Sequence, residues 1–291
     1  MKTIYKSKQS EIAMMELYDR QLKAFDIEFE DLYVDTRFGK THVVKTGNPN
    51  GKPLLVIHGG NYTMPYELSY FSALLSYFCV YTADTVGHPG KSSQTVISHK
   101  TMEYGEWASD VITGLGFQKM NCLGASLGGG ILVKLMCIAP EKVEKSVLVV
   151  PAGIANASIF SMLRLMFSVG IPMSNYIKTK EDKWLKEILL PMALDEKNIY
   201  DADLEMFKYS FEHIGITNRI PSIAKARDLR KYTAPTFIIV AEHDRMFPSN
   251  KILAKAKKTI PNLKTHILKD QGQKFVLSDS DIDMIVRFIN P

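Results

Sequence analysis

Cysteine is scarce in this chain, and the three that occur do not form a framework. Cys79, Cys122 and Cys137 all lie inside apolar segments. Their odd number and their spacing fit neither a disulfide scaffold nor a cysteine-ligated metal site. We therefore expect no disulfide-stapled fold and no metal centre, and the cysteine usage favours a reducing cytoplasm.

Long apolar runs are also missing. The chain begins with Lys2, Lys6 and Lys8, but no continuous apolar stretch or small-residue cleavage site follows, as a secretion signal would require. The most apolar later stretch starts at Ile159 and is interrupted by Arg164, well short of a membrane span. The sequence thus predicts a protein that is neither exported nor embedded in a membrane.

Neither positive nor negative charge is concentrated in one segment of the chain. The 36 basic and 31 acidic side chains leave a net charge of +5, and the basic ones are scattered. The densest run, Lys255, Lys257 and Lys258, falls in an amphipathic helical pattern and is typical of a solvated helix face. A nucleic-acid partner is not indicated.

Short apolar runs bounded by turn residues recur along the chain and predict strands covered on both faces. We expect these strands at Pro53–His58, Phe78–Asp84, Met120–Gly124, Ser146–Val150, Pro235–Ala241 and Leu263–Leu268. Helical patterns separate them, at Pro65–Ser76, Met102–Leu115, Leu127–Ala139, Asn250–Thr259 and Asp279–Ile289. This alternation predicts an α/β fold with a mostly parallel central sheet and helices on both faces.

Two further segments complete the predicted organisation. An apolar stripe over Glu11–Phe25 predicts an N-terminal helix, and a hairpin follows around Phe38-Gly39-Lys40. The rhythm breaks between Pro151 and Arg230, where helical spacing continues without a convincing strand. We expect a core formed by residues 1–150 and 231–291, with the N-terminal helix in 1–26, and a helical cap inserted at 151–230.

One short motif carries the strongest chemical signal. Gly124-Ala125-Ser126-Leu127-Gly128 matches G-x-S-x-G between a predicted strand and a predicted helix. In such a turn the serine adopts a strained backbone and raises its hydroxyl above the sheet edge. The N–H of Leu127, at the start of the helix, favours negative charge at the same point. The alternative is a small-residue turn that only lets strand and helix pack closely.

A second turn supports the functional interpretation. His58-Gly59-Gly60-Asn61 follows the first central strand, where Gly60 or Asn61 would supply the second backbone donor of an oxyanion hole. A purely structural glycine turn is the alternative. After the next strand, Gly90-Lys91-Ser92 resembles the end of a phosphate-binding loop, but Thr85 replaces its first glycine and no helix follows at once. We therefore expect no nucleotide.

With these motifs the sequence resembles the α/β-hydrolase superfamily, in particular its lidded carboxylesterase and lipase-like branches. The resemblance covers roughly residues 41–291 and is carried by the Ser126 turn, the His58-Gly59-Gly60 turn, the Asp84–Ser92 loop and Ala241-Glu242-His243-Asp244. It implies that Ser126 is a nucleophile and that Asp244 is the acid of a catalytic triad. Asp244 could equally cap the helix that begins near Pro248.

The resemblance fails at the third triad position. The family usually has Gly-His followed within two residues by an aromatic, whereas this chain reads Gly272-Gln273-Lys274-Phe275. Gln273 therefore stands where the histidine is expected. Its amide can hydrogen-bond to a serine and to a carboxylate, but it cannot accept the serine proton near neutral pH.

Other histidines do not match the motif. His42, His99, His213 and His266 lie in other segments; His58 and His88 follow strands at the expected active edge, where His58 is more typical of a residue that orients the oxyanion turn. A laboratory substitution, a natural inactive relative and an unusual mechanism remain open as explanations of Gln273.

The resemblance implies a serine hydrolase that acts on a small carboxylic ester, impaired by Gln273. No cofactor is needed, and the sequence does not indicate an oligomeric state. The apolar cap would supply an acyl pocket, for which we expect Phe160, Leu163, Met166 and Phe167. The alternative is a binding or regulatory protein that keeps the pocket without catalysis.

Overall fold

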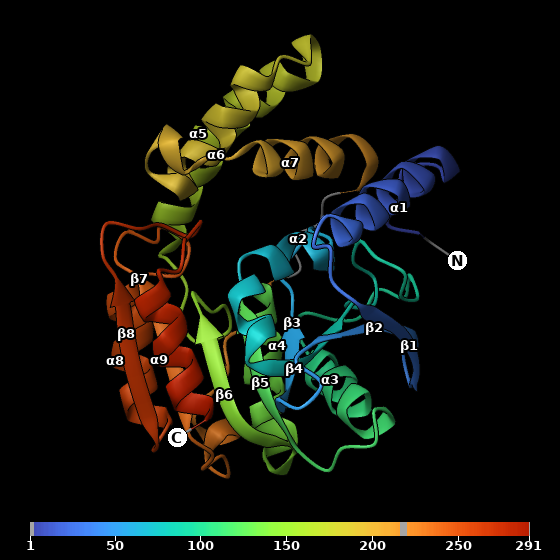
Figure 1. Ribbon diagram of the computed structural model, residues 1–291. Helices are drawn as coiled ribbons and strands as arrows, with labels where there is room; N and C mark the ends of the chain where they lie inside the picture. Colours follow the sequence, from blue (N-terminus) through green and yellow to red (C-terminus); the bar gives the residue numbers. More distant parts are fainter. Residues whose placement is uncertain (1–2, 216–219, 291) are drawn as a thin grey trace.

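A single sheet forms the centre of the molecule. The computed structural model describes residues 3–215 and 220–290. Within them the strand order is β1-β2-β4-β3-β5-β6-β7-β8 (Figure 1). The strands are β1 (Phe29–Thr36), β2 (Gly39–Gly47), β3 (Lys52–Ile57), β4 (Phe78–Ala83), β5 (Met120–Ala125), β6 (Val143–Val149), β7 (Thr236–Ala241) and β8 (Leu263–Leu268). Strand β2 is antiparallel to β1 and β4, and the other neighbouring pairs are parallel.

Helices occupy most of the connections between strands. The α-helices are α1 (Lys8–Lys23), α2 (Met64–Ser69), α3 (Glu103–Gly114), α4 (Leu127–Ile138), α5 (Ile159–Thr179), α6 (Asp182–Ala193), α7 (Asp201–His213), α8 (Ser249–Thr259) and α9 (Asp279–Ile289). Short 3₁₀ helices lie at Ser72–Ser76, Pro140–Lys142, Glu196–Asn198 and Ala226–Leu229.

Two apolar layers sandwich the sheet. Side chains of α3, α4 and α8 form the core on one face, whereas α1, α2 and α9 cover the other. Because both faces are covered, all six residues of β7 are buried. The prediction of an α/β fold with a mostly parallel sheet is confirmed, and its continuous apolar runs correspond to these doubly covered strands.

One predicted helix is divided in the structure. The pattern predicts a helix over Pro65–Ser76, but α2 ends at Ser69 and a 3₁₀ helix starts at Ser72. The backbone leaves helical geometry at Phe71, with φ −118° and ψ 11°. Phe71 and Leu74 are both buried in the same apolar layer, so tertiary packing replaces the regular helix here.

Helices α5, α6 and α7 connect β6 to β7, and the described part of 151–230 contains no strand. In Figure 1 they lie beyond one edge of the sheet, and α7 extends toward α1. Helix α7 contacts both α1 and α6, while α5 packs against α6. This segment therefore lies over the edge where β3, β5, β7 and β8 end.

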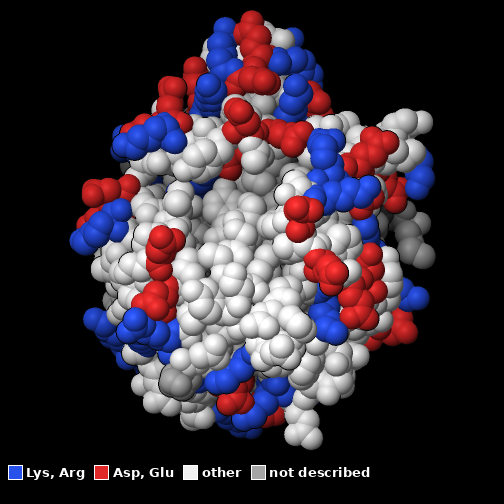
Figure 2. All heavy atoms as spheres, viewed as in Figure 1, with Lys and Arg blue, Asp and Glu red and all other residues white. Residues whose placement is uncertain are grey.

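The surface carries charges of both signs. On the face shown in Figure 2, acidic and basic side chains are interspersed around an uncharged central area. Among the described residues, no helix combines the length and the apolar character that a bilayer crossing requires.

Helix α4 approaches the sheet more closely than a side chain would allow. A Cβ atom added at Gly128 would overlap the carbonyl oxygen of Ile57 in β3. One added at Gly124 would lie 2.6 Å from the Gly128 carbonyl carbon. Both clashes involve backbone, which cannot move aside as a flexible side chain can. The glycines of the Ser126 turn therefore set the distance between strand and helix.

We expect Gly128→Ala to lower the free energy of unfolding by about 2–3 kcal/mol, because backbone must shift to admit the methyl group. Gly170→Ala in α5 is the matched control, since no atom beyond the neighbouring backbone of its own helix lies within 4 Å of the added Cβ. That change should be neutral or stabilise by about 0.5–1 kcal/mol, because alanine favours the helix. Urea unfolding followed by circular dichroism measures both; equal effects would contradict the close approach.

Candidate active site

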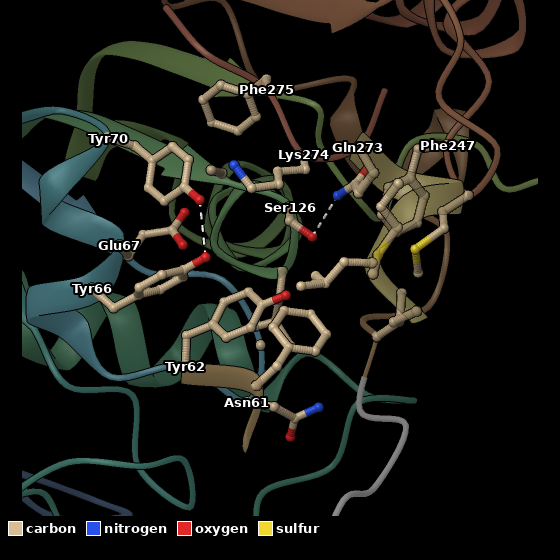
Figure 3. Close-up of a pocket in the computed structure, with 18 of the residues that line it drawn as sticks. Asn61, Tyr62, Tyr66, Glu67, Tyr70, Ser126, Phe247, Gln273, Lys274 and Phe275 are labelled. Carbon is tan, nitrogen blue, oxygen red and sulfur yellow. Dashed lines mark hydrogen bonds between the residues drawn. The ribbon is translucent and has the colours of Figure 1, made fainter. Parts of the chain in front are cut away.

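Four loops bring the candidate residues to one place. Gly60 and Asn61 follow β3, Ser126 follows β5, Asp244 follows β7 and Gln273 follows β8. Because these strands are parallel, their carboxyl ends share one edge of the sheet, where open α/β sheets bind ligands. Figure 3 shows Ser126 and Gln273 pointing toward each other at this edge.

Ser126 has the strained backbone that its motif predicts. Its φ is 48° and its ψ is −113°, and it is the N-cap of α4. Such a conformation costs about 1–3 kcal/mol and persists only where neighbours fix it. Here the Ser126 N–H donates to Val149 O at 2.9 Å, and its carbonyl accepts from Gly130 N at 3.1 Å and Ala152 N at 2.9 Å. The hydroxyl is therefore held at the positive end of the helix.

Gln273 links Ser126 to Asp244. In one orientation of the amide, Nε2 donates to Ser126 Oγ at 2.9 Å, and Oε1 faces the Asp244 carboxyl group. In the reversed orientation, the Gln273 NH₂ donates to Asp244, at 3.1 Å from Oδ1, and Oε1 accepts from Ser126 Oγ at 2.9 Å. The three side chains thus form a continuous row in the order serine, amide, carboxyl.

The helix-capping alternative for Asp244 is wrong, because the N-cap of α8 is Pro248 and no side chain caps that helix. Asp244 Oδ1 accepts the N–H groups of Met246 at 2.8 Å and Phe247 at 2.9 Å, so it shapes the turn before α8. The same carboxyl group meets the Gln273 amide. Burial raises the pKa of Asp244 to about 7, although the two backbone donors oppose this rise.

The protonation of Asp244 decides how the Gln273 amide lies. A protonated carboxyl group can donate to Oε1, which leaves Nε2 to donate to Ser126. An ionised carboxylate is an acceptor only, so it requires the NH₂ and turns Oε1 toward the serine hydroxyl. Neither arrangement gives Ser126 a base of useful strength.

The turn after β3 is fixed from several directions. His58 Nδ1 lies 2.6 Å from Gly59 O, and His58 Nε2 accepts the Thr85 N–H at 3.0 Å. Asn61 has a positive φ of 61°, and its carbonyl accepts from Ser210 Oγ of α7 at 2.7 Å. His58 is therefore a structural residue that orients this turn, as the sequence favours.

Gly60 and Leu127, two of the predicted oxyanion donors, are neighbours. A Cβ atom at Gly60 would lie 3.3 Å from Leu127 Cδ1. Gly60, Asn61, Leu127 and Ser126 all line the same cavity. The turn after β3 and the start of α4 therefore meet in the cavity wall beside Ser126.

The cavity over Ser126 has a volume of about 360 Å³. Its wall is mainly apolar and aromatic, with a small polar region. Besides the residues already named, the lining includes Tyr62, Tyr66, Glu67, Tyr70, His88, Met162, Leu189, Met192, Phe207, Ile220, Lys274 and Phe275.

The four residues predicted to form the acyl pocket are wrong. Phe160, Leu163, Met166 and Phe167 do not line the cavity, and the first and last are 80% and 74% exposed. Only Met162 of α5 reaches it. The helical period identifies an apolar face, but only the packing of α5 against α6 decides which face turns toward the site.

A buried polar cluster forms one side of the cavity, and the sequence did not reveal it. The hydroxyls of Tyr66 and Tyr70 donate to Asp203 Oδ1 at 2.7 and 2.8 Å. Lys274 Nζ lies 3.0 Å from Asp203 Oδ2. Asp203 belongs to α7, whereas its three partners belong to the core, so no local pattern could link them.

The structure places four of the histidines that lie outside the triad position. His42 lies between Asp84, at 2.9 Å, and Asp31, at 2.6 Å, and His266 pairs with Asp281 at 2.8 Å. Burial lowers the pKa of His58. His88 lines the cavity and its Nε2 lies 3.1 Å from the Tyr104 hydroxyl.

One group of described residues has the spacing of metal ligands. Glu242, His243 and Asp270 lie together at the surface, away from the cavity lining. Glu242 also pairs with Lys269 at 2.9 Å. Exposed acidic groups of this kind are common on protein surfaces, and we assign no metal to them.

Comparison with known proteins identifies the scaffold. The family model described as the alpha/beta hydrolase fold matches residues 52–279, well over half of the chain. The chain belongs to the α/β-hydrolase family. This hydrolase is 25% identical to carboxylesterase YbfK of Bacillus subtilis (strain 168) over 281 residues, which cover 94% of this chain and 91% of that protein.

Solved structures give the same fold for this hydrolase. The crystal structure of carboxylesterase CesB (YbfK) from Bacillus subtilis matches with a TM-score of 0.77 and 23% identity over 97% of each chain. That of naproxen esterase from Bacillus subtilis matches with a TM-score of 0.79 and 20% identity, covering 98% of this chain and all of the other. The hydrolase is therefore carboxylesterase-like in sequence and in fold.

The raised pKa of Asp244 predicts how stability depends on pH. Since the pKa is higher in the folded than in the unfolded state, the folded protein binds more protons between pH 4 and 7, and its stability falls as pH rises through this range. Asp244→Asn removes this effect. The free energy of unfolding of Asp244→Asn, minus that of the parent, should therefore rise by up to about 4 kcal/mol from pH 4 to pH 7.

Urea unfolding at several pH values measures this difference. Asp35→Asn, at an exposed carboxylate of β1, is the control and should give no such trend. A stability difference for Asp244→Asn that does not change between pH 4 and 7 would contradict the raised pKa.

Proposed function

We propose that this chain is a serine esterase scaffold for a small carboxylic ester, with Ser126 as nucleophile and with its turnover limited by Gln273. The observation that carries the proposal is the row of Ser126, Gln273 and Asp244 at hydrogen-bonding distance. Only the residue type at the centre of this row departs from what acyl transfer requires.

The proposed reaction follows from these groups. Ser126 Oγ attacks the ester carbonyl carbon, and the carbonyl π electrons move to the oxygen. The N–H of Leu127 and the N–H of Gly60 or Asn61 stabilise the oxyanion. Collapse of this intermediate breaks the bond to the alcohol and leaves an acyl-serine, which water then hydrolyses.

The proton on Ser126 Oγ has no efficient acceptor in this scheme. Histidine would take it during attack and return it to the leaving alcohol, whereas the glutamine amide can do neither. In subtilisin, the loss of the corresponding histidine lowers kcat on the order of a million-fold. We therefore propose that the parent chain binds esters and turns them over very slowly.

The α5–α7 segment supports a role as a cap. Met162, Leu189 and Phe207 from its three helices line the cavity, and Ser210 bonds to the turn after β3. We infer that residues 151–230 form the cap and 1–150 with 231–291 the core, and that the cap selects the ester by its shape. No cofactor enters this chemistry.

A second candidate function is a binding protein without catalysis. It is favoured by the complete pairing of Gln273, whose amide satisfies both Ser126 and Asp244 and so forms a stable closed row. In that case the cavity would bind a small ligand, and the binding would be sensed through the cap.

Gln273→His separates the two candidates. If Ser126 is an esterase nucleophile, the variant should hydrolyse a short-chain aryl ester at least about 1,000-fold faster than the parent, because the imidazole supplies the missing base. The measurements are steady-state release of the aryl alcohol and labelling of Ser126 by a fluorophosphonate.

Two controls complete the experiment. Gln273→Ala should stay as slow as the parent, and Ser126→Ala in the histidine background should lose both turnover and labelling. A folded Gln273→His variant that neither labels nor turns over the ester would reject the esterase proposal. Retained ester binding by that variant would then support the binding function.

A further inference from the structure

A buried carboxyl group in the cavity wall has no part in the chemistry above. Glu67 belongs to α2 and lines the cavity, yet the residue is only 6% exposed. Figure 3 shows it between Tyr66 and Tyr70, with Ser126 lying between it and Gln273 in this view. A buried carboxyl group is unfavourable unless it is paired, so its position requires a reason.

Glu67 contacts the turn that follows β3. The backbone N–H of Gly59 lies near enough to its carboxyl group to oppose the rise in the pKa of Glu67. The contact is close, because a Cβ atom at Gly59 would lie 3.2 Å from Glu67 Oε2. Gly59 immediately precedes Gly60 and Asn61, the two proposed oxyanion donors of this loop.

Two other contacts of the turn involve its backbone carbonyl groups and not its N–H groups. His58 engages the carbonyl of Gly59, and Ser210 engages the carbonyl of Asn61. Both contacts hold carbonyl oxygen atoms of the loop. Glu67 lies at the Gly59 N–H, in the peptide unit that joins His58 to Gly59, which directly precedes the unit that carries the Gly59 carbonyl and the Gly60 N–H.

We propose that Glu67 is a positioning residue for the oxyanion hole, whose carboxyl group holds the Gly59 N–H and thereby orients the N–H groups of Gly60 and Asn61. The inference rests on the proposed esterase function for its effect on turnover. In this role Glu67 does not contact the substrate carbonyl.

The charge of Glu67 is compatible with this task. Burial raises its pKa to about 7, while the Gly59 N–H opposes the rise. Near neutral pH a large fraction of the molecules therefore carries an uncharged Glu67. In those molecules Glu67 does not oppose the negative charge of an oxyanion. A neutral amide at this position should consequently perform the same task.

The kinetic test uses the Gln273→His background. Glu67→Ala should lower kcat about 10- to 100-fold toward a short-chain aryl ester and change KM by less than about twofold, since a misplaced oxyanion donor acts on the transition state. Glu67→Gln should restore kcat to within about threefold, because its side-chain oxygen still accepts the Gly59 N–H. Glu16→Gln, at an exposed glutamate of α1, is the matched control and should change neither constant.

A second measurement does not depend on catalysis. Hydrogen exchange of the Gly59 amide, followed by NMR in the parent chain with Gln273, should accelerate at least about tenfold in Glu67→Ala and stay near the parent rate in Glu67→Gln. Thermal unfolding of each variant shows whether the fold is retained.

The outcomes separate this inference from the proposed function. An inactive Gln273→His variant would reject the esterase, whereas faster exchange of the Gly59 amide in Glu67→Ala would still support Glu67 as the anchor of the turn. An active Gln273→His variant whose kcat is unchanged by Glu67→Ala would overturn the inference. Equal losses in the alanine and glutamine variants, with a lower Tm in both, would also overturn it, because they would indicate a structural role.

Discussion

The positive φ of Ser126 is the constraint on which the site depends. Three backbone hydrogen bonds hold this conformation, from β6, from α4 and from the loop after β6. It places the hydroxyl at the start of α4 and above the sheet edge. The same geometry requires glycine at positions 124 and 128, because helix and strands approach too closely for a side chain. A site of this kind stores strain that the surrounding sheet must support.

Gln273 occupies the centre of the hydrogen-bonding row beside that serine. Gln273 spans the distance that an imidazole would span and pairs with both neighbours. The hydrogen-bonding row is therefore preserved although the basic group is lost. The buried carboxyl of Asp244 adds a dependence on protonation, because an ionised and a neutral carboxyl group require opposite orientations of the amide.

The α5–α7 segment contributes more than a cover over the cavity. Asp203 of α7 accepts hydrogen bonds from two core tyrosines and pairs with Lys274, and Ser210 of the same helix bonds to Asn61. A helix of the segment is thus tied both to the polar side of the cavity and to the turn after β3. Any displacement of α7 would be transmitted directly to that turn, because these contacts are short and buried.

The apolar pattern alone predicts the α/β architecture, since doubly covered strands need continuous apolar runs and crossover helices need the 3.6-residue period. The G-x-S-x-G motif pointed to Ser126 and the family resemblance to Asp244 and Gln273, and the structure brings the three together because they follow parallel strands that end at one edge. The side of α5 that faces the cavity depends on how the helices pack, and Phe160 and Phe167 lie exposed instead of lining it. The fold alone brings Glu67 to Gly59, and Tyr66 and Lys274 to Asp203, because such contacts join segments whose separation in sequence has no period.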